Sequence, residues 1–440
     1  MRPRQVRLKL NKSQFQHCQK LSQESARVWN ATKNFFWRTY RKKGIWLSES
    51  SMKRYILRRF SLHSQSVQAV VEKFYDNLKS AHSLRQENPS IHYPYKNKNW
   101  FCVHWKRSAI QVSGRYIRLS NGQGSQCIIF KLPSELADCQ PNCVELIWQN
   151  GYWLSITQKV EGKQQLLGFN TAAVDMGEIH AITITDGKDA AVISGRQLRS
   201  VKHNRNKRVA QIQRMQSRCV KKSRRWQRLQ AVKSKVLAEC HRRTKDLNHK
   251  ITRFTVDWCV EHNIEKLIIG DVTGIAQNTN KEKRLNRKNR QKVSQWSFYQ
   301  QRQYLEYKCD EIGIETVLES ENQTSKTCPK CGHKHKPIGR NYHCPACNLK
   351  IHRDVVGAVN IRTKHLTGVL NGNDNFKSPK VKYLRIDHWS RSSSVAGVNR
   401  WERRKSRLYH RSLSVPVQLT LFPLSPKDGV KTKQAVRRKT

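Results

Sequence analysis

Residues 324–360, with the sequence TSKTCPKCGHKHKPIGRNYHCPACNLKIHRDVVGAVN, decide how the second half of the chain folds. Cys328, Cys331, Cys344 and Cys347 form two C-x2-C pairs separated by twelve residues. This spacing lets four thiolates converge on one tetrahedral zinc ion. The alternatives are two disulfides or four unrelated thiols that happen to be close, but close cysteine pairs in a chain without a secretion signal favour zinc. We therefore expect a zinc ribbon here, and such ribbons are usually structural.

An aspartate and several histidines accompany the cysteines. Asp354, Ala358 and Ile361 occupy positions i, i+4 and i+7 of a predicted helix, so the carboxylate shares a face with residues that pack on a sheet. The alternative role for Asp354 is a helix N-cap. A catalytic role requires partner carboxylates from elsewhere in the chain. The nearby histidines could each replace a cysteine as a zinc ligand, but surface or nucleic-acid-contacting positions are expected for them: His333, His335, His343 and His352.

The composition points to a polyanionic partner. The chain has 440 residues, enough for two to four domains, and Lys+Arg 85 against Asp+Glu 31 gives a net charge of +54. No long apolar run indicates a membrane span, and the N-terminus MRPRQVRLKL lacks the apolar core of a signal peptide. The 13 cysteines show no second paired pattern. A reduced, cytosolic compartment without membrane association is expected.

The first 160 residues resemble a nucleic-acid-holding lobe. A strand at residues 6–10 is followed by three predicted helices, at 12–42, from 49 to 58 and at 67–84. Residues 93–160 form short alternating runs separated by Gly, Asn and Pro, which indicates antiparallel strands in a small barrel or sheet. Aromatic and basic residues interleave here. Some could stack on bases, although most of the aromatic side chains are expected in the core.

Residues 161–365 predict an α/β layer. Asp175 ends an apolar run on a strand that returns through residues 181–185 as a hairpin. A carboxylate there is costly unless it is hydrated, paired or bound to metal, and turn capping is the alternative. Further expected elements are helices at 197–262, a strand at 264–271, a helix at 296–312 and a strand at 314–318.

A run of basic residues lies inside the predicted helical segment 197–262. Few acids lie nearby to balance it, so phosphate contact is favoured over a solvated surface. The residues assigned to nucleic-acid binding are Lys221, Lys222, Arg224, Arg225 and Arg228.

Five motifs of this region resemble the RuvC-like nuclease domain, of RNase H type, found in the transposon-encoded TnpB (OrfB) family and the compact type V CRISPR effectors. In chain order they are VDMGEIHAIT at 174–183, LIIGDVTGI at 267–275, QYLEYK at 303–308, TSKTCPKCG at 324–332 and HRDVVGAVNI at 352–361. The first 160 residues match the family only in general character, a wedge-like β unit with an inserted helical unit. Residues 366–440 match no motif.

The resemblance implies DNA cleavage with Mg2+ held by three carboxylates. The family's first and last acids map to Asp175 and Asp354. The usual glutamate is replaced by Gly270, which ends the strand at 267–269. The strand near Leu318 is expected beside that strand, and some family members carry a glutamate three residues before the Thr-Ser-Lys segment, where this chain has Glu321. The expected triad is Asp175, Glu321 and Asp354, with a solvated loop acid as the alternative for Glu321. Weaker candidates are Asp271, Glu306 and Glu319.

The resemblance also implies the overall organisation and partners. We expect a β-barrel with an inserted helical unit at 1–160, a RuvC-like domain at 161–365 with its zinc ribbon at 324–350, and a basic, disordered tail at 366–440. The implied function is RNA-guided cleavage of double-stranded DNA by a protein of a mobile element, with the element's RNA as guide. One alternative is a nuclease-inactive RNA-guided repressor, because of Gly270. A strand transferase is a third, weaker alternative.

Overall fold

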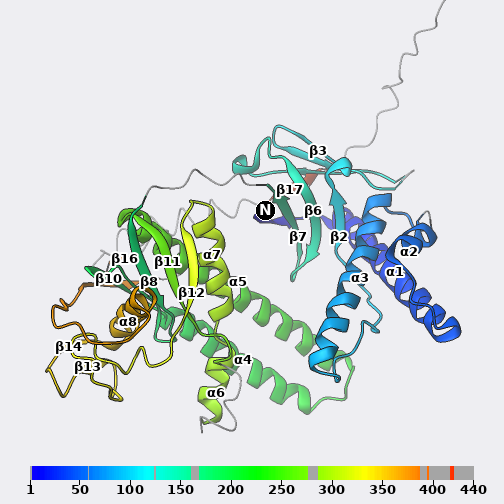
Figure 1. Ribbon diagram of the computed structural model, residues 1–440. Coiled ribbons are helices and arrows are strands. Elements are labelled where there is room, and N and C mark those ends of the chain that lie inside the picture. Colours follow the sequence, from blue (N-terminus) through cyan, green and yellow to red (C-terminus); the bar gives the residue numbers. More distant parts are fainter. Residues whose placement is uncertain are drawn as a thin grey trace, which may run out of the picture. The chain divides into compact units, whose positions relative to one another are not determined.

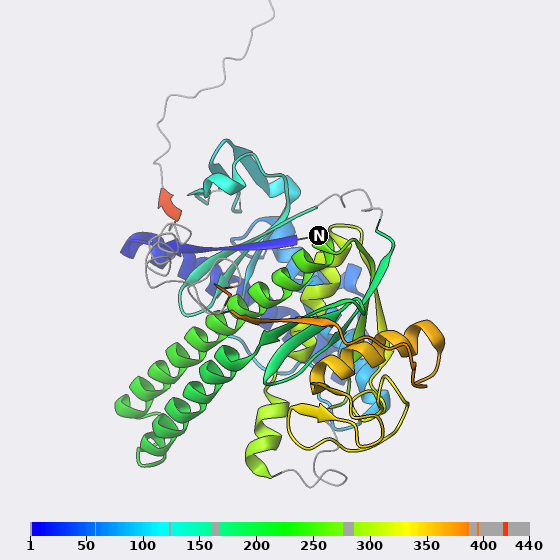
Figure 2. The same cartoon turned by 90° about the vertical axis from the view of Figure 1, so that its left-hand side faces the viewer.

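The structure is a computed structural model that describes residues 2–57, 59–122, 125–159, 168–275, 286–386, 394–395 and 417–420. The chain divides into two compact units. One comprises Met1–Val160 and Ser414–Thr440, and the other Glu161–Leu413. Figures 1 and 2 show the elements of both units along the chain. Among the described helices, none combines the length and the apolar composition needed to cross a membrane.

Three helices of the N-terminal unit lie where the sequence predicts them. They are α1 (Lys12–Lys43), α2 (Glu49–Ile56) and α3 (Ser64–Glu87). Asn11 caps α1 in a capping box with Gln14, and Ser48 caps α2. The apolar faces of these helices share one core with the unit's strands. Seven aromatic side chains, such as Trp29, are buried in this core, and five more are partly buried against it.

The strands of this unit form one eight-stranded sheet of order β2-β6-β7-β1-β17-β5-β4-β3. Their bounds are β1 Arg2–Lys9, β2 Val103–Lys106, β3 Ile110–Ser113, β4 Tyr116–Leu119, β5 Ile128–Lys131, β6 Pro141–Trp148, β7 Tyr152–Gln158 and β17 Val417–Thr420. Two short 3-10 turns, Arg107–Ala109 and Ser134–Leu136, join some of them. No ladder joins the end strands β2 and β3 in the described residues.

The second unit is built on a seven-stranded sheet of order β12-β11-β8-β9-β10-β15-β16. The strands are β8 Asn170–Asp175, β9 His180–Thr185, β10 Asp189–Ser194, β11 Ile264–Asp271, β12 Glu315–Ser320, β15 Lys380–Arg385 and β16 Ser394–Val395. Strand β11 is parallel to both β8 and β12, and Gly270 pairs with Glu319. The carboxyl ends of these three strands therefore meet at one edge of the sheet, as the RNase H-type resemblance implies.

Helices cover both faces of this sheet. Side chains of α5 (Arg224–Glu261) and α7 (Phe298–Asp310) pack in the largest core cluster of the unit, with Ala172, Ile182 and Ile269. Helix α8 (Arg353–Thr367) packs on the opposite face, where Ile361 contacts Ala173 and Ile268. Because side chains alternate between the two faces of the sheet, the strands contribute buried residues to the cores on both faces. The long basic segment is two helices, α4 (Arg196–Ser217) and α5, and the short α6 (Arg287–Ser294) precedes α7.

The segment after residue 366 contains more structure than the sequence predicts. Strand β15 pairs in parallel with β10 over six residues, and β17 pairs with β1 and β5. The expectation of disorder is therefore wrong for residues 380–385 and 417–420, whose backbone groups are recruited into the two sheets. Most of the remaining tail lies outside the described residues, as does the part of the predicted basic loop before residue 286.

Candidate active site and zinc ribbon

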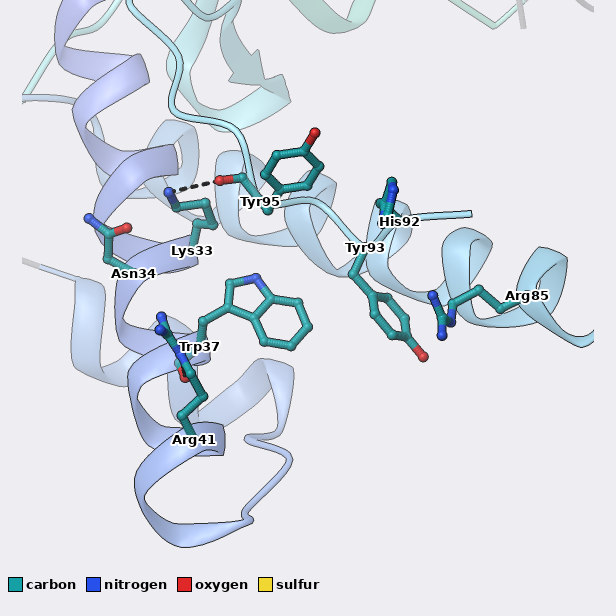
Figure 3. Close-up of a pocket in the computed structure, with 8 residues that line it drawn as sticks. All are labelled: Lys33, Asn34, Trp37, Arg41, Arg85, His92, Tyr93 and Tyr95. Atoms are coloured by element: carbon teal, nitrogen blue, oxygen red, sulfur yellow. Dashed lines mark hydrogen bonds between the residues drawn. The ribbon is translucent and has the colours of Figure 1, made fainter. Parts of the chain in front are cut away.

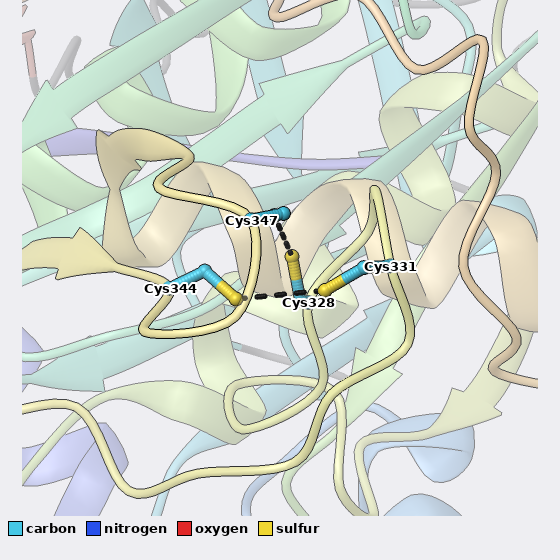
Figure 4. Close-up of side chains that lie close together, drawn as sticks. All are labelled: Cys328, Cys331, Cys344 and Cys347. Carbon is cyan, nitrogen blue, oxygen red and sulfur yellow. Dashed lines mark hydrogen bonds between the residues drawn. The ribbon is translucent and has the colours of Figure 1, made fainter.

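The four predicted zinc ligands converge. The sulfur atoms of Cys328 and Cys347 lie 3.6 Å apart, and so do those of Cys331 and Cys344 (Figure 4). Zinc–sulfur bonds of about 2.3 Å in a tetrahedron place neighbouring sulfurs about 3.8 Å apart, so the four thiols match the dimensions of a zinc site. The ligand atoms of all four lie within 4.8 Å of one another, and none of the nearby histidines joins this group in the described chain.

Backbone turns shape the ribbon around the cysteines. Gly332 has a φ of 72° and its N–H donates to the Cys328 carbonyl, as in a zinc knuckle. Burial would raise the pKa of the Cys344 thiol, but the backbone N–H groups of Cys347 and Ala346 and the neighbouring sulfurs outweigh it and lower the pKa to about 7. The ribbon closes through the small hairpin of β13 (Asn341–His343) and β14 (Lys350–His352).

Asp175 ends strand β8 and faces helix α8. Its Oδ2 atom would lie only 2.6 Å from a side-chain carbon added at Gly357, so the carboxylate fits against the helix because that position has no side chain. Burial, followed by the negative charges of Glu321 and Asp354, raises the pKa of Asp175 well above its ordinary value. The charges of both other predicted carboxylates thus act on Asp175.

Glu321 fills the space that a side chain at Gly270 would occupy. A carbon added at Gly270 would lie 2.9 Å from both Cγ and Cδ of Glu321, and closer still to its Oε1. The carboxylate of Glu321 therefore stands over the end of β11, where the family's usual glutamate is expected, although it comes from the loop after β12. This observation favours Glu321 as the replacement acid.

The loop that carries Glu321 is fastened to helix α8. The hydroxyl of Thr324 donates to the Glu321 carbonyl at 2.8 Å. The buried Asn360 side chain of α8 donates to the carbonyls of Thr324 and Thr327, both at 2.7 Å. Because Asn360 is 2% exposed, these bonds are shielded from water and fix the loop against the helix that bears Asp354.

Asp354 is held by two basic side chains. Its Oδ2 lies 2.7 Å from His180 Nδ1, and both its oxygens accept from Arg340, at 3.0 and 3.1 Å. Burial would raise the pKa of Asp354, but the His180 hydrogen bond and the Arg340 charge lower it. The N-cap alternative is wrong, because His352 caps α8 and its Nδ1 accepts from the Asp354 N–H. His180 and Arg340 were not singled out from the sequence.

The carboxylates fit a hard divalent cation only in part. Within the described chain, Asp354 forms a cluster with His180 and His352 whose ligand atoms lie within 4.8 Å of one another, and Asp175 and Glu321 lie outside this cluster. Oε1 of Glu321, however, is shielded from solvent and has no hydrogen-bond partner in the part of the chain that is described. Burying a carboxylate oxygen without a hydrogen-bond donor costs free energy. A cation that prefers oxygen ligands, such as Mg2+, would compensate this oxygen.

The three weaker candidates each have a basic partner. Arg302 lies 3.9 Å from Asp271 and 3.4 Å from Glu306, and Glu319 pairs with Lys364 at 3.3 Å. Their carboxylates are thus compensated, whereas Oε1 of Glu321 has no hydrogen-bond partner among the described residues.

The pKa of Glu321 predicts how pH affects the metal-free protein. Burial, followed by the charge of Asp271, raises this pKa from 4.5 to about 7. Between pH 4.5 and about pH 7, Glu321 keeps its proton in the folded protein, whereas it has released it in the unfolded chain. The contribution of Glu321 to the free energy of unfolding is therefore lost as pH rises through this range. We expect Glu321→Gln to stabilise the metal-free protein at about pH 8 and to have a smaller effect at about pH 5. Thermal unfolding without added Mg2+ and without a chelator, so that zinc in the cysteine ribbon is retained, measures this difference. An equal effect at both pH values would contradict the assignment.

The predicted phosphate-binding run lies at the turn between α4 and α5. Lys221 and Lys222 belong to the connection, while Arg224, Arg225 and Arg228 begin α5, and all five are exposed. Ser223 caps α5 through the Trp226 N–H, which fixes where this helix starts. The run therefore presents five cations to solvent at the end of a helical hairpin.

A concave surface in the N-terminal unit combines basic and aromatic side chains. A cavity of about 390 Å³ lies between α1, α3 and the segment that follows α3 (Figure 3). Lys33 Nζ donates to the Tyr95 carbonyl at 3.1 Å, and Trp37 Nε1 donates to the Pro94 carbonyl at 2.9 Å, which fixes the segment on α1. None of the lining residues is acidic: Lys33, Asn34, Trp37, Arg41, Arg85, His92, Tyr93 and Tyr95. Such a surface suits a nucleic-acid strand.

Known families match two regions of the chain. Residues 155–276 match a family described as a probable transposase (OrfB_IS605), and residues 298–361 match the Cas12f1-like TNB domain. The fold is that of the compact type V effectors: a Cas12f1–sgRNA–target DNA complex solved by cryo-EM aligns with a TM-score of 0.57 at 15% identity, covering 80% of this chain and 83% of that chain.

Curated relatives point the same way. The TnpB-like protein MJ0751 of Methanocaldococcus jannaschii is 30% identical over 148 residues, which cover 33% of this chain and 50% of the relative. The CRISPR-associated endodeoxyribonuclease Cas12f1 of Sulfoacidibacillus thermotolerans is 24% identical over 126 residues, 28% of each protein. The matched part of this chain thus covers half or less of the length of each of these relatives. In these regions the chain is therefore similar to TnpB-family proteins and to the type V effectors.

Proposed function

We propose that this protein is an RNA-guided, divalent-metal-dependent DNA endonuclease of a mobile genetic element, acting in the cytosol. The matched relatives include proteins named endodeoxyribonucleases, and the fold aligns with an effector solved with guide RNA and target DNA. The net charge of +54 suits a protein that holds two nucleic acids.

The position of Glu321 over Gly270 carries the proposal. A chain that had simply lost its second carboxylate would leave the space beside Gly270 without an acid, because the neighbouring Asp271 already has Arg302 as a partner. Here a carboxylate occupies that space, close to Asp175, with one oxygen shielded and, among the described residues, unpartnered. This arrangement supports an active enzyme over the nuclease-inactive repressor.

The chain's own residues would perform distinct tasks. Asp175, Glu321 and Asp354 would hold Mg2+, which when bound activates water and stabilises the leaving oxygen of a phosphodiester. His180 orients Asp354 through the 2.7 Å contact. Arg340, whose side chain is 43% exposed, has further N–H donors beyond those bound to Asp354, and these can bind a phosphate oxygen of the DNA.

The experiment that tests the proposal uses the protein expressed with the DNA that flanks its gene. The RNA that copurifies is sequenced, and DNA complementary to its variable end is offered with Mg2+ or with a chelator. We expect one discrete RNA and cleavage that requires Mg2+. Guided binding without cleavage would favour the repressor. Only heterogeneous RNA that dissociates at moderate salt would contradict guidance altogether.

The basic turn between α4 and α5 gives a prediction of its own. Replacing Lys221, Lys222, Arg224, Arg225 and Arg228 together by glutamine should weaken RNA binding. The slope of log affinity against log salt should become shallower by about one for each phosphate that the turn no longer neutralises. The matched control replaces Lys79 and Arg253, exposed cations that already pair with Glu49 and Asp257. An unchanged salt slope in the quintuple variant would show that the turn does not contact RNA.

A further inference from the structure

A group of side chains of the types that bind metal lies within the N-terminal unit. His104 on β2 is paired directly with Glu145 on β6. Cys102 lies two residues before His104, and Cys143 two residues before Glu145. Because side chains alternate along a strand, His104, Cys143 and Glu145 project from the same face of the strand pair, and Cys102 lies just before β2. The sequence spacing alone gave no sign of this group, since its halves are about forty residues apart.

The histidine ring is contacted from both sides. Its Nδ1 lies 2.9 Å from Glu145 Oε1, and its Nε2 lies 3.1 Å from Cys102 Sγ. Ligand atoms of His104, Cys143 and Glu145 all lie within 4.8 Å of one another. The His104 side chain is 14% exposed, so the ring is shielded while the group stays reachable from solvent through Glu145, which is 34% exposed.

We propose that His104, Cys143 and Glu145 bind a second zinc ion, with Cys102 supporting the outer ring nitrogen of His104. A thiolate, an imidazole and a carboxylate are the ligands that zinc accepts together, whereas magnesium requires oxygen ligands. Ligand atoms around tetrahedral zinc lie about 3.5 Å apart, so small side-chain rotations bring these three into place. The Cys102 contact is the kind of outer partner that fixes the ring of a zinc-bound histidine.

The site would fasten an end strand of the sheet. β2 has only four residues and pairs only with β6 in the described chain. A zinc ion bound between His104 and the two β6 ligands adds a cross-link to this short ladder. Because the ion would bind only the folded arrangement, it would stabilise the N-terminal unit. Zinc binding at this site does not depend on nuclease activity.

Zinc content of the full-length protein tests the proposal. The protein is purified without a histidine tag in reducing buffer, and bound zinc is measured by mass spectrometry after dialysis. We expect two zinc ions per chain, falling to one in Cys143→Ala and to one in the ribbon variant Cys344→Ala. The matched control, Cys139→Ala, removes another free half-buried thiol of the same unit and should retain two. One zinc in the unaltered protein, or two in Cys143→Ala, would overturn the proposal.

Milder variants guard against misfolding of Cys143→Ala. Cys102→Ala and Glu145→Gln should keep the circular dichroism of the unaltered protein. Competition with a chelating dye measures zinc affinity at each of the two sites. In Cys102→Ala, one site should bind zinc about 10–100-fold more weakly, which is the effect of removing an outer partner of a metal ligand. In Glu145→Gln, the same site should be weakened at least as much. Unchanged affinity in both folded variants would refute the site. Cobalt substitution adds a readout, because the four-thiolate ribbon and a one-thiolate site absorb differently.

Discussion

Replacing Glu321 by alanine is expected to lower DNA cleavage by more than about 100-fold. Removing a residue that only supports a metal ligand costs up to about 100-fold in activity. The loss should be larger because Glu321 would itself hold the ion that activates water. Binding of guide RNA and target DNA should persist, since the affinity of such complexes rests chiefly on phosphate contacts. Single-turnover cleavage at saturating protein, with binding measured in parallel, checks both expectations.

The matched control for this variant is Glu319→Gln. Glu319 lies two residues earlier, on the same strand end, but its carboxylate pairs with Lys364 and His365. Cleavage by this variant should stay within a few-fold of the unaltered protein. If Glu321→Ala cleaved normally, or if Glu319→Gln were equally inactive, Glu321 would not be the third carboxylate.

The sequence predicted four of the seven strands in the sheet of the second unit, because their signals are local, and it missed β10, β15 and β16. The apolar runs ending at Asp175 and Gly270 are buried strands, and the cysteine pairs converge because each pair spans only a tight turn. Placing Glu321 required more, namely that the strands before Gly270 and Glu321 be neighbours. Their register confirms that adjacency, with Gly270 opposite Glu319.

Other features escaped the sequence because they depend on long-range pairing. His180 and Arg340 meet at Asp354 from segments 174 and 14 residues away, and neither has a local pattern that marks it. Strand β15 is short and basic, and strand β17 is short and of mixed composition. Both form strands because they pair with the open edges of neighbouring strands, which their own sequences do not indicate. The group around His104 likewise exists only once β2 pairs with β6.

Gly270→Ala should lower DNA cleavage almost as strongly as Glu321→Ala, although it removes no carboxylate. The added methyl group would lie 2.9 Å from Cγ and Cδ of Glu321, so the acid must leave its place. The atoms displaced are the far end of a flexible side chain rather than backbone. The melting temperature should therefore change little while cleavage falls, and thermal unfolding beside a cleavage assay separates the two effects.

Moving the carboxylate back provides the reciprocal test. Gly270→Glu alone should be inactive, because two side chains compete for one space, whereas Gly270→Glu combined with Glu321→Ala frees that space for the new glutamate. Cleavage by the double variant should exceed that of either single variant, a coupling that independent sites would not show. Gly270→Ala with Glu321→Ala controls for relief of crowding, and it should stay inactive because it restores no acid. If Gly270→Glu with Glu321→Ala cleaved no better than either single variant, the space above Gly270 would not belong to the metal site. Full activity of Gly270→Ala would show that Glu321 does not need its place above Gly270 for cleavage.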